Sequence, residues 1–395
     1  MYKTWVRICL LNLMIAASIG ALLRFAFVDA VPWMQYRHFQ HAHSHLAMLG
    51  WVYLILFSSF VLSFLSLAQQ KKVYPALFWL TQITVIGMLV SFPFQGYGMY
   101  SILFLVAHTL LSYVFTYRFI KDLRQNHDNS LSAVFAITSL ALMVLSLFGI
   151  WLLGITMATA GKGDTWYYLS VQFFLHFQFN GWFIFGVLSL FFKILEQHSI
   201  AIPFTHAKWF FWLLLVSCLL TFSISIAWVT ASTFALWING IGVVIQLIAA
   251  YVFVLIIRRI PFKSIFGFWS RVLVSIAIFC FLLKILIQTT LVLPEVAEIA
   301  FIIRNFTIVF IHLIFLGIVT LFMLGFSFYK GGLNMQKRSS QWGIGLLLTG
   351  FILSELILFS QGTMFWMQLG FMPYHYLTLF GVSALMPVGL LLILI

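Results

Sequence analysis

Residues 41–67 read HAHSHLAMLGWVYLILFSSFVLSFLSL, and this stretch decides the fold class. It contains no aspartate, glutamate, lysine or arginine. A run of about 20 apolar residues is long enough, as a helix, to cross the hydrocarbon core of a bilayer. The stretch therefore predicts a transmembrane helix, with three histidines at alternating positions at its start.

The rest of the chain has the same character. Of 395 residues, 63% are hydrophobic and 7% are charged, whereas soluble domains carry about 25% charged residues. The net charge of +13 comes from short basic clusters between apolar runs, so no nucleic-acid partner is expected. The cysteines lie in separate runs and form no CxxC pair, which excludes a disulfide framework. We expect an all-α integral membrane protein, a single transmembrane domain embedded in the lipid bilayer.

Twelve apolar runs predict twelve transmembrane helices. They are separated by prolines, glycines and charged turns. Their expected bounds are 5–28, 41–67, 73–92, 99–120, 131–157, 168–195, 208–230, 233–257, 267–290, 298–328, 341–362 and 373–394.

Charge predicts the topology. Most lysines and arginines fall at the N-terminus or in turns that follow even-numbered helices. Because basic residues concentrate on the cytoplasmic side, both termini are expected in the cytoplasm. The first run has a basic start but no clear cleavage site, so we expect a retained helix of a multi-pass protein in the inner (plasma) membrane.

A short motif recurs three times, a histidine followed five residues later by glycine. The three histidines are His45, His176 and His312. They lie on the second, sixth and tenth predicted helices, and this four-helix interval predicts three pseudo-repeated four-helix units of about 1–125, 126–260 and 261–395.

Histidines at membrane depth are the main candidates for a functional site. Imidazole is a ligand for iron, copper and zinc, and haem iron takes axial histidines from facing helices. His41 and His45 share a helical face that His43 does not, and the choice of ligand among these three stays open. A single buried histidine can instead bond a carbonyl group. The candidate metal ligands are His41, His43, His45, His108, His176 and His312.

Four other charged residues lie within the apolar runs. Arg24 and Arg304 lie toward the outer side, where arginine binds carboxylates such as haem propionates or extends to lipid headgroups. Lys284 and Glu355 are expected either to pair or to serve proton or quinol transfer.

These features resemble subunit I of the haem-copper oxidases and nitric oxide reductases. The resemblance implies a haem b held by His45 (or His41) and His312, and a copper ligand at His176. The run at 208–230 lacks the family's histidine pair, and the tenth helix carries one histidine rather than two. The NnrS-type haem and copper membrane proteins are therefore the closer resemblance.

The sequence thus predicts a haem b protein with copper or another transition metal near His176, His41 and His108. Redox or nitric oxide and oxygen chemistry is expected, as in an oxidoreductase without the full haem-copper site; turnover itself is left open. The electron donor would be a quinol or a cytochrome, and an oligomer or partner subunit is compatible with this reading. The alternatives are a non-haem copper or zinc site at His41, His45, His176 and His312, a transporter, or a structural subunit.

Overall fold

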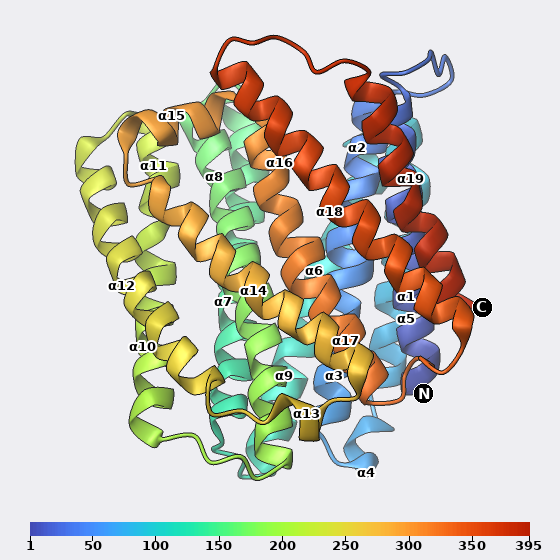
Figure 1. Ribbon diagram of the computed structural model, residues 1–395, viewed down its shortest axis with the longest axis vertical. Helices are drawn as coiled ribbons and strands as arrows, with labels where there is room; N and C mark the ends of the chain where they lie inside the picture. Colours follow the sequence, from blue (N-terminus) through green and yellow to red (C-terminus); the bar gives the residue numbers. More distant parts are fainter. The chain divides into compact units, whose positions relative to one another are not determined.

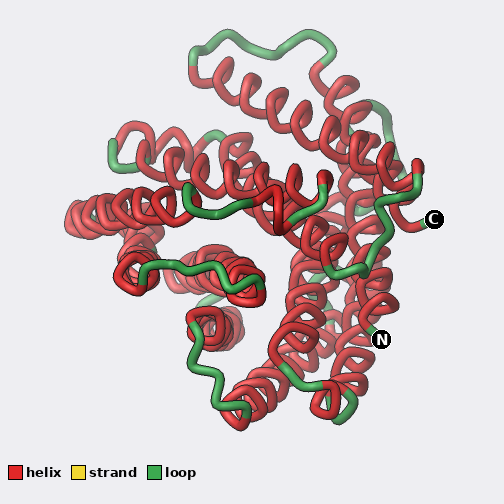
Figure 2. Tube along the Cα trace, turned by 60° about the horizontal axis from the view of Figure 1, so that its bottom comes forward, coloured by secondary structure: helices red, strands yellow, loops and turns green.

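The computed structural model describes all 395 residues and consists of helices joined by loops, without a β-strand (Figures 1 and 2). Twelve helical segments are long and apolar enough to cross a membrane. The prediction of an all-helical protein with twelve long apolar helices is confirmed, and we treat it as a multi-pass membrane protein.

Each predicted run overlaps one of these spans. The twelve spans are formed by α1 (Tyr2–Phe25), α2 (Tyr36–His45) with η1 (Leu46–Tyr53) and α3 (Leu54–Phe64), α5 (Tyr74–Gln95), α6 (Met99–Gln125), α7 (Leu131–Thr159), α8 (Thr165–His176) with η2 (Phe177–Phe183) and α9 (Ile184–Gln197), α10 (Phe204–Thr221) with α11 (Ser223–Thr230), α12 (Thr233–Ile257), α14 (Phe268–Thr290), α16 (Arg304–His312) with η3 (Leu313–Thr320) and α17 (Leu321–Tyr329), α18 (Arg338–Trp366), and α19 (His375–Leu394). Short helices α4 (Leu67–Gln70), α13 (Phe262–Ile265) and α15 (Pro294–Ile302) lie between spans.

Helix starts follow local side-chain chemistry. The Ser130 hydroxyl accepts a hydrogen bond from the backbone N–H of Ala133 and caps α7. Asp164 caps α8 and Ser232 caps α12 in the same way. Such side chains satisfy N–H groups that the first turn of a helix leaves without partners.

The tenth span differs from the prediction, which placed one helix over 298–328. The chain forms α15 up to Ile302, passes through an extended Ile303 (φ −85°, ψ 98°), and begins α16 at Arg304. An extended residue interrupts the ladder of helical hydrogen bonds. Phe301 and Ile302 before the break are apolar, and only the charged Arg304 that begins α16 marks it in the sequence.

Three spans share a construction that hydropathy did not predict. In each, a π-helix starts directly after the repeated histidine: η1 after His45, η2 after His176 and η3 after His312. These three spans are also the most buried ones. Of their most apolar 18 residues, 67–89% are buried, whereas the share in the other nine spans is at most 56%. Because π-helices are rare and cluster at functional sites, the three repeated motifs mark the helices of functional interest.

The chain divides into two compact units. Unit 1 comprises residues 1–122, 268–274 and 303–395, and unit 2 comprises residues 123–267 and 275–302. The predicted three-unit division stays a prediction.

In unit 1, α18 and α19 lie side by side (Figure 1). Gly343 on α18 and Gly389 on α19 face each other so closely that a Cβ on either would lie 2.5 Å from the other's carbonyl oxygen. Small residues allow such close approach in membrane helices. No flexible side chain can move aside here, because the obstacle is backbone.

We expect Gly343→Ala to destabilise the protein by about 1–3 kcal/mol, the usual cost of overpacking. Gly345→Ala is the matched control, because a Cβ there meets nothing within 4 Å. It should leave stability unchanged or raise it slightly, since alanine favours a helix. Thermal unfolding in detergent measures both. Equal melting temperatures for the two variants would contradict the close helix contact.

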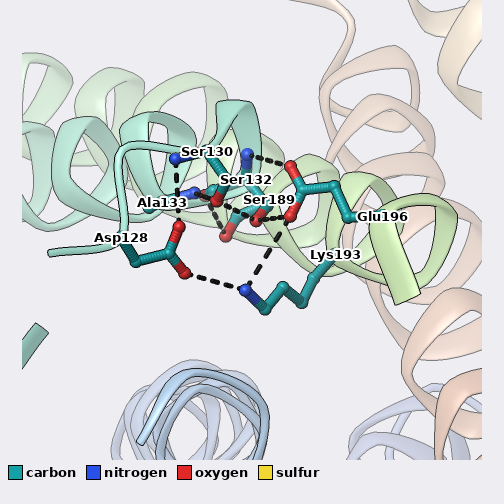
Figure 3. A network of polar contacts seen from close by, with 7 residues as sticks. All are labelled: Asp128, Ser130, Ser132, Ala133, Ser189, Lys193 and Glu196. Atoms are coloured by element: carbon teal, nitrogen blue, oxygen red, sulfur yellow. Dashed lines mark hydrogen bonds and ion pairs between the residues drawn. The ribbon is translucent and has the colours of Figure 1, made fainter. Parts of the chain in front are cut away.

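In unit 2, a polar network joins the start of α7 to the end of α9 (Figure 3). Lys193 donates to Asp128 Oδ2 at 2.8 Å, and the Ser132 backbone and hydroxyl donate to Glu196 at 2.9 and 2.5 Å. Burial raises the pKa of Asp128, but hydrogen bonds from Lys193 and Ser130 outweigh it, so the pKa lies below its ordinary value of 3.8. The charged carboxylate therefore stabilises the folded state.

Asp128→Asn should lower the free energy of unfolding by about 0.5–1 kcal/mol at neutral pH. Because the folded pKa is depressed, the stabilisation is complete above pH 3.8 and disappears as the pH falls through the lower folded value. Chemical unfolding at several pH values tests this. The exposed Glu298→Gln serves as control, and an equal loss there would count against the network.

Candidate functional site

His43 projects from α2 toward α1 in unit 1. Its Nδ1 lies 2.8 Å from the carbonyl oxygen of Ala16. Its ring rests against Gly20, where a Cβ would lie 2.9 Å from the ring. A carbonyl oxygen can only accept, so this hydrogen bond requires the proton on Nδ1, and neutral His43 keeps its lone pair on Nε2.

His312 has a similar arrangement at the end of α16. Its Nδ1 lies 2.9 Å from Glu355 Oε1 on α18, and the Ser354 hydroxyl donates to the same oxygen at 3.1 Å. The carboxylate holds the proton of His312 on Nδ1 and leaves the Nε2 lone pair available. His43 and His312 interact electrostatically, so unit 1 brings together two imidazoles of the same tautomer.

Two arginines of unit 1 are linked to this neighbourhood. Arg24 interacts electrostatically with Glu355 and Tyr36, and Tyr36 interacts with Arg304. The Nη1 of Arg24 is buried and has no hydrogen-bond partner. His375 also interacts with Arg24 and has a buried Nδ1 without a partner. Arg24 therefore lies near His43 and Glu355 and has capacity for an anionic group, whereas Arg304 is linked to this neighbourhood only through Tyr36.

His45 faces a different neighbourhood of unit 1. Its Nδ1 bonds the His41 carbonyl at 2.9 Å, and its ring stacks on Phe92 with centroids 4.5 Å apart. It interacts electrostatically with His41 and His108. The Nε2 of His108 is buried without a hydrogen-bond partner. His41, His45 and His108 thus form a second histidine group on the other side of α2.

His176 lies in unit 2 and is 7% exposed. Its Nε2 lies 2.8 Å from the Cys218 carbonyl oxygen, and the Asn180 amide approaches its Nδ1 at 3.4 Å. Because the carbonyl requires a proton on Nε2, the amide can donate to Nδ1. Both ring nitrogens have partners, which is the carbonyl-bonded arrangement of a buried structural histidine.

In neither unit do three histidine, cysteine, aspartate or glutamate side chains group as metal ligands. A haem needs two axial ligands, and in unit 1 His43 and His312 each have their Nδ1 bonded, to the Ala16 carbonyl and the Glu355 carboxylate, and their Nε2 without a hydrogen bond. The sequence favoured His45 as the partner of His312, whereas the structure brings His43 toward it. Glu355 was expected to pair with Lys284 or to serve proton or quinol transfer; its ion-pair partner is His312 instead. Gly20 carried no motif that identified its role.

The spans that carry His43 and His312 are also joined further along the chain from these histidines. Trp51 in η1 donates from Nε1 to the Thr320 hydroxyl in η3 at 2.8 Å, and both side chains are 1% exposed. A buried hydrogen bond between two π-helices fixes the spacing of the spans that carry His43 and His312.

Comparison with protein-family models gives no match, and comparison with curated proteins gives none either. The function therefore has to be inferred from this geometry.

A double-mutant cycle tests the link between the π-helices. Trp51→Phe and Thr320→Val should each destabilise the protein, and the double variant should lose about 1 kcal/mol less than the sum. Thr320→Val keeps the side-chain shape, whereas Trp51→Phe also removes buried volume; the cycle separates that loss from the hydrogen bond, because it is present in the single and the double variant alike. Unfolding free energies in detergent give the coupling. Additive losses would mean that the two side chains do not interact.

Proposed function

We propose that the protein binds haem b between His43 on α2 and His312 on α16 and acts as a membrane electron-transfer protein. The observation that carries this proposal is the pair of imidazoles whose Nδ1 atoms are held by Ala16 and Glu355. Facing helices in a bundle core commonly present axial histidines in this way.

The chain's own residues have distinct roles at such a site. The Ala16 carbonyl and the Glu355 carboxylate fix the ring orientations through Nδ1, as outer partners of metal-ligating histidines generally do. Gly20 leaves room for the His43 ring. Arg24 and Arg304 are suited to the propionate carboxylates.

Two histidine ligands determine the class of chemistry. A haem with both axial positions filled supplies one-electron transfer, whereas binding of oxygen or nitric oxide requires an open position. The proposal therefore favours electron transfer over gas reduction. It also extends the resemblance to NnrS-type proteins, with a haem site but without the full haem-copper centre.

We also propose that the chain is built of three four-helix units. It would lie in the inner (plasma) membrane with both termini in the cytoplasm. The recurrence of a π-helix directly after His45, His176 and His312 supports the repeat. The distribution of basic residues supports the orientation.

A second candidate is a non-haem metal site. The observation that favours it is the buried, unpartnered Nε2 of His108, close to His45, which would supply one ligand to copper or zinc; the remaining ligands would have to come from outside this pair, because no three such side chains group there. Metal analysis separates the two candidates: haem predicts about one iron per chain, and the alternative predicts copper or zinc without iron.

The deciding experiment is a reduced-minus-oxidised visible spectrum of the detergent-purified protein, with iron and copper quantified in the same sample. We expect a b-type spectrum that carbon monoxide leaves unchanged, because both axial positions are filled. A featureless spectrum from well-folded protein would refute the haem proposal. A strong response to carbon monoxide would refute the two-histidine ligation.

Two variants on the same helix test the ligand assignment. His43→Ala should remove most of the haem, whereas His45→Ala should retain it, since His45 faces Phe92 and His108. Haem per folded chain, measured by the pyridine haemochrome spectrum after size exclusion, is the readout. The reverse outcome would assign His45 as the axial ligand instead.

A further inference from the structure

A groove lies between α5 and α6 in unit 1. Its volume is about 480 Å³, within the range of about 300–1,000 Å³ that is typical of sites for small ligands. Most of its wall is apolar, with Ile86, Val90 and Phe94 on α5 and Phe104 on α6. The Phe104 ring packs against Gly87, where a Cβ would lie 2.5 Å from the ring, so the two helices meet in the apolar part of the groove.

The groove faces the hydrocarbon of the bilayer. It lies on two membrane-spanning helices, and Ile86, Val90 and Phe94 are 49%, 58% and 84% exposed. Ile86 lies near the middle of α5 and Gln95 is its last residue. At 1.5 Å per residue this stretch is about 14 Å long, roughly half of a hydrocarbon core of about 30 Å. The groove therefore has the length of one lipid leaflet.

The polar side chains of the groove gather at the end near the α5–α6 loop. They are Ser91, Gln95 and Tyr100, and no charged side chain lines the groove. The Ser91 hydroxyl is buried and has no hydrogen-bond partner. Ser58 on α3, by contrast, donates to the carbonyl four residues earlier, at 2.7 Å. A buried hydroxyl without a partner is unfavourable, and the hydrocarbon layer offers no water to satisfy it.

We propose that this groove binds one glycerophospholipid. An acyl chain lies along Ile86, Val90 and Phe94, and an ester carbonyl accepts a hydrogen bond from the Ser91 hydroxyl. Ser91 lies about one turn before the end of α5, which is the depth at which hydrocarbon gives way to the ester groups of a lipid. The same molecule thus covers the apolar wall and satisfies the hydroxyl, whereas a hydrocarbon without an acceptor would leave Ser91 unpaired.

The lining also determines what the site does not select. Because no charged side chain lines the groove, zwitterionic and anionic phospholipids should bind with equal affinity. Selectivity should depend on the ester carbonyl instead. This proposal is independent of haem, since none of the histidines or arginines of the candidate site lines the groove.

The experiment counts and titrates bound lipid on the purified full-length chain by native mass spectrometry in maltoside detergent. The probes are palmitoyl-oleoyl phosphatidylcholine and a diether phosphatidylcholine, which lacks the ester carbonyls. We expect the wild type to bind the ester lipid about three- to tenfold more tightly, the effect of one buried hydrogen bond. Ser91→Ala should bind the ester lipid more weakly by the same factor and lose the preference. Equal affinity of the wild type for both lipids would overturn the proposal.

A second variant tests the position of the chain. Val90→Trp places a large side chain in the groove and should remove one bound phospholipid per chain. Val244→Trp on α12 is the matched control, because Val244 is equally exposed, at 56%, and lies outside the groove. An equal lipid count in the two variants would overturn the assignment to the groove. Size exclusion checks the folding of each variant.

Phosphatidylglycerol with the same acyl chains completes the test. It should match phosphatidylcholine in affinity and in its dependence on Ser91. Tighter binding of the anionic lipid that Ser91→Ala leaves unchanged would identify a basic surface as the lipid site and overturn the proposal.

Discussion

The satisfaction of polar groups inside the hydrocarbon layer is the constraint on which this structure depends. A buried N–H or carbonyl without a partner is costly because no water is available. Four of the intramembrane histidines, His43, His45, His176 and His312, accordingly bond a fixed neighbour. The partner of each ring nitrogen decides the tautomer, and the tautomer decides which nitrogen remains for a ligand. The ability of each of these histidines to bind a ligand therefore depends on the group that bonds its other ring nitrogen.

The sequence was sufficient for the coarse fold. Long apolar runs and charged turns located all twelve spans, because hydrocarbon thickness sets helix length. Within an apolar run, hydropathy does not distinguish an α-helix from a π-helix or reveal a break in the helix. The extended Ile303 is followed by Arg304 and Asn305, and η2 contains Gln178 and Asn180, but hydropathy averaged over a span does not register such local changes of backbone geometry.

The sequence predicted which residues belong to the candidate site, but it did not predict which of them lie next to each other. The histidines and arginines were identified because charge within an apolar run is rare. Their grouping depends on helix rotation, which the sequence leaves free: His43 and His45 lie two residues apart, yet one bonds α1 and the other stacks on α5. Glu355 was visible as a buried acid, but its partner His312 could be assigned only once α16 and α18 were packed together.

The repeated motif therefore does not by itself define a metal ligand. His176 and His312 share the same spacing to glycine and the same π-helix, but they differ in what they bond. His176 has a carbonyl at one nitrogen and an amide at the other, so ligation would require breaking a buried hydrogen bond. His312 has a carboxylate at Nδ1 only, so ligation at Nε2 leaves its hydrogen bond in place. A carboxylate partner also increases the basicity of the ring. The repeat supplies the scaffold, and the residue opposite each histidine determines whether that histidine is a structural or a ligand-binding side chain.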